Sequence, residues 1–329
     1  MNSHEQKMLT ISVPTYNRAD YLDICLDSIC RQVRGHEDVV EVVISNNCSQ
    51  DHTDDVVNKY KAGGHQISYV SNEENIGMDG NIYQAFRLAS GKYVWIFSDD
   101  DILLEGSLER ILPLLQEEYG VIHVRSHSYT DDHRIERPKR GESKGVTIYS
   151  GKADFIGRVN VMLTFVSGNI INKNLVDTDL NYDAFIGSFL VLLLWTFSSL
   201  LNAERNLYVE DFTLAAKENN TGGYQLCRVF GPNMNRVFEY FSHRGIDPSY
   251  FRIIVETMIR SFFPSNILRL RTNRGKFLQE DFDQTLRPVF KHYRSFWLVI
   301  WPAIHLPLPL ARLWFKLCKK YFKLVGKKL

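Results

Sequence analysis

The chain has 329 residues, of which 44% are hydrophobic and 23% charged, and its formal net charge is +1. This is the composition of an ordinary globular protein with one large domain or two modest ones, and the charge gives no general attraction for nucleic acid. The five cysteines are odd in number and contain no CxxC pair, so they indicate neither a disulfide framework nor a zinc site and fit a reducing cytosol.

Strands and helices are expected to alternate four times in the first 120 residues. Apolar runs predict strands, and helical spacing predicts helices, at 9–13, 20–33, 39–44, 51–60, 67–70, 81–89, 93–97 and 107–118. This alternation predicts an α/β fold with a mostly parallel sheet and helices on both faces. In such sheets ligands bind outside the carboxyl ends of the strands. The polar clusters at 14–18, 45–51 and 98–101 should therefore converge on one edge.

Asp99, Asp100 and Asp101 follow the fourth strand directly. Three adjacent carboxylates repel one another and are tolerable when a divalent cation neutralises them. Oxygen ligands alone suit Mn²⁺ or Mg²⁺, with a diphosphate completing the coordination shell. We therefore predict that Asp99 and Asp101 bind the metal and that Asp99 and Asp100 lie at the diphosphate. The alternative is a solvated acidic turn before the helix at Ser107.

The cluster after the first strand is a candidate nucleoside site. Pro14 ends the strand, Thr15 can face a base or ribose, and Tyr16 can cover it, with Asn17 and Arg18 completing the set. The alternative is an ordinary turn between strand and helix, for which proline and asparagine are typical residues.

The cluster after the second strand offers amide and hydroxyl groups. Asn46, Asn47 and Ser49 suit hydrogen bonding to the edge of a base. A structural alternative exists, because Ser49 or Asp51 can cap the helix that follows.

In order and spacing, four segments resemble glycosyltransferase family 2, the inverting enzymes with the GT-A fold: Ser12–Arg18, Ser45–Asp51, Asn75–Asn81 and Trp95–Leu103. The resemblance covers about residues 9–120 and implies a nucleotide-diphosphate sugar donor. It implies that the nucleoside lies at Pro14, Thr15 and Tyr16 and that the metal and diphosphate lie at Asp99–Asp101. The donor-binding residues expected from the third segment are Asn75, Gly77, Asp79 and Asn81. Residues 160–225 resemble, more weakly, the acceptor region of bacterial O-antigen sugar transferases, including abequosyltransferases.

One departure from the family concerns the base of the donor. Family members commonly carry Asp where Asn46 stands, and that Asp accepts the N3–H of uracil. An asparagine can instead donate to N3 of cytosine, which suggests a CDP-sugar. The alternative is that Asn46 turns its carbonyl toward uracil.

The second departure concerns the general base, a carboxylate that inverting transfer needs to deprotonate the acceptor hydroxyl. Many family members use the Asp of a Glu-Asp pair at a helix start, where this chain has Asp183 without such a pair. The pair Glu210-Asp211 follows a strand-like run at 207–209. Asp183 and Asp211 are both candidates, with a helix-capping or surface role as the alternative for each. The missing pair leaves a second hypothesis, a non-catalytic membrane-bound scaffold that binds nucleotide sugars.

The C-terminal third is expected to be helical. We predict a GT-A domain over 1–225, with a nucleotide half at about 9–120 and an acceptor half at about 121–225, followed by a helical region over 226–329. From Arg312 to Leu329 there are seven Lys or Arg and no acid. A helix from Leu310 would separate partly into aromatic and basic faces, so the tail at about 296–329 is predicted to lie on an anionic membrane surface. The alternative is a terminal helix packed on its own domain.

These features predict an inverting transferase that moves a sugar from a nucleotide diphosphate to a lipid-linked, undecaprenyl-type saccharide in bacterial O-antigen or capsule synthesis. The first eight residues show no secretory signal, and the apolar stretch 185–201 is expected to be a buried core helix. The expected location is cytoplasmic, peripheral to the inner face of the cell membrane, with no nucleic-acid partner. The oligomeric state is not predicted.

Overall fold

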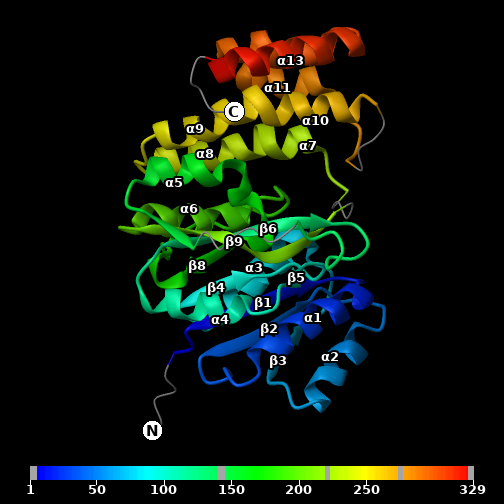
Figure 1. The fold of residues 1–329 in the computed structure, drawn as a ribbon, viewed down its shortest axis with the longest axis vertical. Helices are drawn as coiled ribbons and strands as arrows, with labels where there is room; N and C mark the ends of the chain where they lie inside the picture. Colours follow the sequence, from blue (N-terminus) through cyan, green and yellow to red (C-terminus); the bar gives the residue numbers. More distant parts are fainter. Residues whose placement is uncertain (1–5, 139–144, 219–222, 273–276, 325–329) are drawn as a thin grey trace. The chain divides into compact units, whose positions relative to one another are not determined.

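The computed structural model describes residues 6–138, 145–218, 223–272 and 277–324 (Figure 1). The chain divides into two compact units. The first comprises Met1–Phe155 and Met162–Glu218, and the second comprises Ile156–Val161 and Asn219–Leu329. The first unit contains the sheet, and the second is helical.

The described strands form one sheet in the order β3-β2-β1-β4-β8-β6-β9-β5, with β7 paired to β9. Strands β1 to β4 run parallel, β8 is antiparallel to both β4 and β6, and β6 runs parallel to β9. The expected α/β fold with a mostly parallel sheet is thus confirmed, with antiparallel pairs in its second half. The strands are β1 (Leu9–Thr15), β2 (Val40–Asn46), β3 (Ile67–Ser71), β4 (Tyr93–Ile96), β5 (Ile102–Leu103), β6 (Val121–Tyr129), β7 (Val146–Tyr149), β8 (Asn169–Asn172) and β9 (Asn206–Lys217).

Helices cover both faces of the sheet. Side chains alternate between the two faces along each strand, so each strand packs against helices on both sides. Leu9, Ile11 and Val13 of β1 belong to one buried cluster with residues of α1 and α2. On the other face, Ser12 donates to the carbonyl oxygen of Ala85 in α3 at 2.8 Å. The helices of this unit are α1 (Ala19–Val33), α2 (Thr53–Ala62), α3 (Gly77–Leu88), α4 (Ser107–Ile111) and α6 (Leu192–Asn202), while α5 (Lys152–Val159) crosses into the second unit.

Two elements differ from the sequence expectations. The helix expected at 107–118 leaves the α conformation after Ile111 and continues as a 3-10 helix, η1 (Leu112–Gln116). Pro113 lies at its start and lacks the N–H that an α-helical turn would use. The strand-like run at 207–209 is the beginning of β9, which continues to Lys217. The apolar stretch 185–201 contains the buried helix α6. In the described parts of the chain, no helix combines the length and apolar character needed to cross a bilayer.

The second unit is a set of helices joined by π-helical turns. Pro232 lies inside η6, and Pro264 and Pro302 stand at the first turns of the helices that follow η7 and η8. A proline has no N–H to donate four residues back, so the helical ladder widens beside it. The elements are α7 (Leu226–Arg228), η6 (Val229–Asn233), α8 (Met234–His243), α9 (Ser249–Thr257), η7 (Met258–Phe262), α10 (Phe263–Leu270), α11 (Phe282–Phe290), η8 (Phe296–Ile300), α12 (Trp301–His305) and α13 (Leu308–Leu324).

Candidate active site

The three consecutive aspartates are buried at the carboxyl edge of the parallel strands. Asp99, Asp100 and Asp101 expose only 2%, 8% and 3% of their surface, so a solvated acidic turn does not describe them. Adjacent parallel pairing of β1 and β4 brings Thr15 beside this cluster, and its hydroxyl donates to Oδ2 of Asp99 at 2.8 Å. The convergence expected for the first and last polar clusters is therefore observed.

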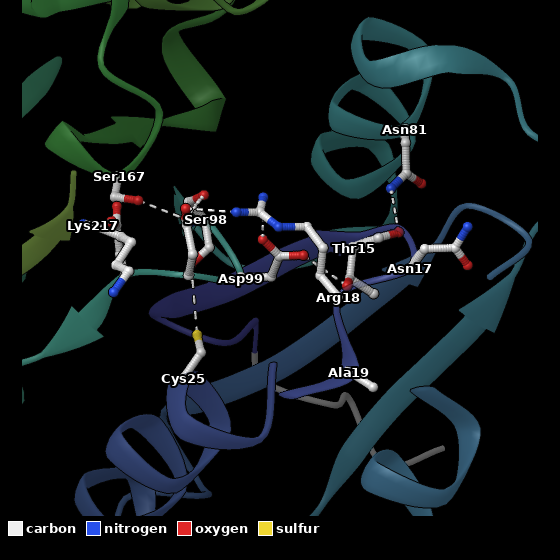
Figure 2. Close-up of polar contacts among 12 residues, drawn as sticks. Thr15, Asn17, Arg18, Ala19, Cys25, Asn81, Ser98, Asp99, Ser167 and Lys217 are labelled. Atoms are coloured by element: carbon white, nitrogen blue, oxygen red, sulfur yellow. Dashed lines mark hydrogen bonds and ion pairs between the residues drawn. The ribbon is translucent and has the colours of Figure 1, made fainter. Parts of the chain in front are cut away.

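Arg18 bridges two of the carboxylates (Figure 2). Its Nη1 lies 2.8 Å from Oδ1 of Asp99, and its Nη2 lies 2.6 Å from Oδ2 of Asp100. The planar guanidinium can donate to two carboxylates at once. Because the Arg18 side chain is 30% exposed while both carboxylates are buried, the pair marks where the cluster opens to solvent.

Asp101 is held differently. Its Oδ1 accepts a hydrogen bond from the backbone N–H of Lys217 at 3.0 Å, while its buried Oδ2 has no hydrogen-bond partner among the described residues. Burial, helped by the charge of Asp100, raises the pKa of Asp101 to about 7, against the effects of the nearby Ser167 hydroxyl and of the Lys217 N–H. Burial also raises the pKa of Asp99 to about 7, although Arg18 acts in the opposite direction. A buried carboxylate oxygen without a full hydrogen-bond partner is costly, and a proton, a water or a cation can satisfy it.

The donor set is compatible with a divalent cation that takes most of its ligands from elsewhere. In the described parts of the chain, no three His, Cys, Asp or Glu side chains are grouped so as to hold a metal ion by themselves. Both oxygens of Asp99 already accept from Thr15 and Arg18, whereas Asp101 has one oxygen to spare. Mg²⁺ is commonly bound through one or two carboxylates plus substrate phosphates. The residues therefore fit such an ion, with Asp101 as the better placed of the two predicted ligands.

The loops after β1 and β2 are bonded to each other. Asn17, whose φ is 51°, donates its N–H to the hydroxyl of Ser49 at 2.9 Å and accepts from the N–H of Gln50 at 2.6 Å. Asp51 accepts from the N–H of Thr53, the first residue of α2, and from that of Ala19, the first residue of α1. Asp51 thus binds the starts of both helices, although the N-cap position of α2 itself is His52. Pro14 is half-buried and Tyr16 is exposed at this edge, with surface available to a ligand.

The amide of Asn46 is buried and has a defined orientation. Its Oδ1 accepts from the N–H of Ser49 at 3.0 Å, and its Nδ2 donates to the hydroxyl of Tyr69 at 2.6 Å. Tyr69 donates in turn to Asp54. Burial and the bond to Asp54 raise the pKa of Tyr69 to about 12, so this hydroxyl keeps its proton. The N–H of Ser49 requires the amide oxygen on its side, and the Tyr69 hydroxyl, which gives its proton to Asp54, accepts from the amide nitrogen. These two contacts determine the orientation of the amide.

The predicted donor residues at the start of α3 form a framework of amide contacts. Asn47 donates to Oδ1 of Asn75 at 2.8 Å and accepts from the N–H of Ile76, and Oδ1 of Asn75 accepts from the N–H of Gly77. Asn81 donates to the carbonyl oxygen of Ser45 at 2.9 Å. These bonds attach α3 to the end of β2. A direct contact of these side chains with the donor stays a prediction.

Asp79 is buried and binds backbone. It accepts from the N–H of Phe189 at 2.7 Å and from that of Val191 at 3.4 Å. Burial raises its pKa against the effect of these hydrogen bonds. Phe189 has a φ of 63°, so this segment before α6 is a sharp turn that the carboxylate stabilises. The sequence suggested a donor contact for Asp79, whereas the structure shows it attaching this segment to the first turn of α3.

The two general-base candidates lie in different places. Asp183 is exposed in the 3-10 helix η5 (Asp183–Phe185), just before the turn that Asp79 holds at the start of α3. Asp211 lies within β9, six residues before Lys217, in a stretch where β9 bulges against β6. Ile102 pairs with Ala215 and Asp101 bonds to the N–H of Lys217, so the carboxylate cluster lies at the end of β9 and Asp211 lies several residues before it.

Several residues of the site carry no signal in the sequence. Ser167 accepts from the N–H of Ser98 at 2.8 Å, and Tyr129 donates to the carbonyl oxygen of Asp100 at 3.0 Å. The Nζ of Lys217 lies 4.8 Å from the centre of the Tyr129 ring. Tyr129 and Lys217 end the parallel strands β6 and β9, so the strand-end rule would have found them had β9 been predicted at its full length.

A sequence model described as "Glycosyl transferase family 2" matches residues 10–176, which is half of the chain. The chain belongs to this family. This family 2 glycosyltransferase is 37% identical over 102 residues to the abequosyltransferase RfbV of Salmonella typhimurium, and the match covers 31% of this chain and 30% of that protein. It is 33% identical over 113 residues to a GalNAc(5)-diNAcBac-PP-undecaprenol beta-1,3-glucosyltransferase of Campylobacter jejuni, covering 34% of this chain and 36% of that one. Each match thus spans about a third of the curated relative.

Solved structures agree on the fold of this glycosyltransferase. Residues 1–349 of TarS from S. aureus, in complex with UDP-GlcNAc, align with a TM-score of 0.62 at 18% identity, covering 96% of this chain and 92% of that one. The mannosyltransferase PcManGT from Pyrobaculum calidifontis, in complex with GDP-Man and Mn²⁺, aligns with a TM-score of 0.54 at 16% identity, covering 98% and 89%. Membership in an enzyme family favours the glycosyltransferase over the scaffold hypothesis.

Proposed function

We propose that this glycosyltransferase is an inverting enzyme that moves one sugar from a nucleotide-diphosphate donor to a lipid-linked saccharide in the synthesis of a bacterial surface polysaccharide. The observation that supports this most directly is the unpartnered, buried Oδ2 of Asp101 beside the Asp99–Arg18 pair. Such an oxygen is free to bind a cation that the donor diphosphate brings with it.

The residues around the carboxylates have separate roles in this proposal. Asp101, through its free oxygen, and the donor diphosphate together would hold Mn²⁺ or Mg²⁺, and Asp99 is the second predicted ligand. When bound, such an ion supplies Lewis-acid stabilisation of the departing diphosphate. Arg18 and Lys217 bring two cations to the same edge, where they can contact phosphate oxygens. Tyr16, exposed beside them, would cover the nucleoside.

Asp183 is the better candidate for the general base. It is exposed, so an acceptor can reach it, and its segment is attached to the start of α3 at the donor edge. As the acceptor hydroxyl oxygen attacks the anomeric carbon, Asp183 would take the hydroxyl proton and the nucleoside diphosphate would leave from the opposite side. Asp211 is the alternative, and its distance from Lys217 along β9 weighs against it.

For the donor base we propose cytosine. The uracil alternative requires the amide of Asn46 to turn over, which would point its Nδ2 at the N–H of Ser49, placing two donors against each other. In the observed orientation Nδ2 keeps a second N–H, which would donate to N3 of cytosine. The Tyr69 proton is already committed to Asp54, so Tyr69 does not favour the turned-over amide.

The acceptor proposal is supported by the relatives. One is named for an undecaprenol-linked substrate, and another, from Bacillus subtilis, is a putative teichuronic acid biosynthesis glycosyltransferase at 30% identity over 110 residues. A lipid-linked acceptor places the reaction at the inner face of the cell membrane, with the protein bound peripherally.

Donor hydrolysis by the full chain tests the proposal. The purified protein is incubated with UDP-, GDP-, CDP- and dTDP-sugars in Mn²⁺ or Mg²⁺, next to Asp101→Ala, and nucleoside diphosphate release is measured. We expect slow, metal-dependent release from one donor class, CDP first, and its loss in the variant. If no donor is hydrolysed and none binds, the proposal is wrong; if the chosen donor is bound but not hydrolysed, adding a polyprenyl-linked saccharide must start the transfer.

A further inference from the structure

Helix α13 has two apolar faces, and only one of them is covered. Ala311, Phe315, Cys318 and Phe322 are buried in the helical unit. A second set is exposed, from 37% for Trp314 to 87% for Leu324. This exposed set, which we call the outer stripe, consists of Leu310, Leu313, Trp314, Leu317, Tyr321 and Leu324. Packing on the helical unit thus accounts for one face of the tail, and the membrane role expected for the rest stays a prediction.

The basic residues occupy a third sector of the same helix. At 3.6 residues per turn, the buried face, the outer stripe and the basic residues are centred roughly 120° apart around the axis. None of the basic residues forms an ion pair with another residue that the structure describes, and α13 contains no Asp or Glu. The basic set is Arg312, Lys316, Lys319, Lys320 and Lys323, all exposed; Lys327 and Lys328 lie outside the described residues.

The outer stripe continues onto η8 and α12 in the same unit. The indole N–H of Trp314 donates to the carbonyl oxygen of Leu298 at 2.7 Å, which joins α13 to η8. Leu298 is 39% exposed, and its neighbours Trp297 and Trp301 are 48% and 37% exposed. Trp314 is thus bonded to the segment that contains the exposed Trp297 and Trp301, whereas Trp95 and Trp195, the other two tryptophans of the chain, are buried in the first unit.

An apolar stripe with tryptophan, bordered by lysines on a helix that contains no Asp or Glu, has the composition of a helix that lies in the headgroup region of a bilayer. A second copy of the chain would cover the same stripe only by bringing two sets of like charges together. An anionic bilayer instead satisfies both sectors at once, since its acyl chains take the stripe and its headgroups take the lysines.

We propose that the outer stripe, with Trp297, Leu298 and Trp301, docks this protein on an anionic lipid bilayer, with α13 lying in the plane of the headgroups. The inference deepens the proposed function and rests on it for its purpose, because a lipid-linked acceptor is held in such a bilayer.

Vesicle binding by the full chain tests this surface. We compare vesicles of phosphatidylcholine alone with vesicles that also contain phosphatidylglycerol, by co-sedimentation at low and high salt. The wild type is expected to bind the anionic vesicles and to be released by salt. Leu313→Glu combined with Leu317→Glu should weaken binding by about tenfold or more, and Lys316→Glu combined with Lys320→Glu should lower binding to anionic vesicles by a similar factor. The matched control is Ile135→Glu, an exposed apolar residue of the first unit, which should bind like the wild type.

Tryptophan fluorescence distinguishes binding through this surface from nonspecific adsorption to the vesicles. Brominated lipids should quench the exposed tryptophans and leave the signal of buried Trp95 and Trp195 unchanged. The proposal is overturned if the fluorescence is not quenched, or if the Leu313 and Leu317 variant binds as well as the wild type. It is also overturned if the wild type is a dimer and this variant is a monomer that does not bind. Donor hydrolysis is measured in parallel without vesicles. Its absence would count against the proposed function alone, because vesicle binding does not depend on it.

Discussion

Arg18 forms ion pairs with Asp99 and Asp100 at the same time, at 2.8 and 2.6 Å, and so places one positive charge between two buried carboxylates. Because its side chain is partly exposed, solvent and ligands can reach the residue that neutralises the buried carboxylates. The same guanidinium can exchange a carboxylate for a phosphate oxygen when a donor binds. The first prediction follows from this pair.

Replacing Arg18 with alanine should destabilise the protein by about 3 kcal/mol at pH 8, because two buried carboxylates lose their partner. The loss should be smaller at pH 6, where the carboxylates can take up protons. Urea unfolding at both pH values measures it. Arg31→Ala is the matched control, since its pair with Asp27 on α1 is exposed and should contribute less than about 1 kcal/mol. Equal effects of the two substitutions would contradict the assignment.

Asp101→Asn should lower metal-dependent donor hydrolysis but raise the free energy of unfolding. Without metal, an uncharged amide still accepts from the N–H of Lys217 and removes a buried charge, so the variant should gain on the order of 2 kcal/mol at pH 8. The native pKa of Asp101 lies above its unfolded value, so the native state holds the proton longer. Wild-type stability should therefore fall as pH rises from about 4 through 7, and the advantage of the variant should grow over that range.

Thermal unfolding in EDTA, followed by addition of Mn²⁺, checks this prediction. Mn²⁺ should raise the melting temperature of the wild type and leave that of Asp101→Asn nearly unchanged. Asp20→Asn, an exposed carboxylate of α1, is the control and should respond to Mn²⁺ like the wild type. A wild type that shows no response to the ion with nucleoside diphosphate present would remove Asp101 as a ligand.

Asn46→Asp should change the preference for the donor base. A carboxylate cannot donate to N3 of cytosine but can accept the N3–H of uracil. The ratio of CDP to UDP affinity should fall by about tenfold or more, as expected for one reversed hydrogen bond in a buried site. Calorimetric titration of both nucleotides measures the ratio. Asn58→Asp, on the exposed side of α2, should leave it unchanged, and tighter binding of UDP by the wild type would overturn the cytosine proposal.

Asp79→Asn should lower the free energy of unfolding by about 1–3 kcal/mol, because the carboxylate accepts two backbone N–H groups before α6 and an amide serves them less well. Donor affinity of the folded fraction should change little. Denaturant unfolding and nucleotide titration separate the two effects. Unchanged stability together with lost donor binding would instead give Asp79 the direct donor role that the sequence suggested.

The sequence was sufficient for the features that depend on local order. Apolar runs and helical spacing located β1 to β4 and α1 to α3 within a few residues, because burial on a sheet or helix face imposes its period on the sequence. The parallel arrangement then placed the carboxylates at one edge with Thr15 and Arg18. The family resemblance agreed with that edge and was confirmed by the family match.

Tertiary structure decided what each polar atom of that edge contacts. The N–H of Lys217 lies more than 100 residues from Asp101 in the chain, and the bond from Asp79 to Phe189 joins α3 to a distant turn. Hydrogen bonds of this kind require a donor and an acceptor from distant segments to lie about 3 Å apart. The spacing of residues in the sequence does not predict this. The same holds for α13. Its sequence shows apolar and basic residues, but only packing in the helical unit determined that Phe315 is covered while Leu317 is left for another partner.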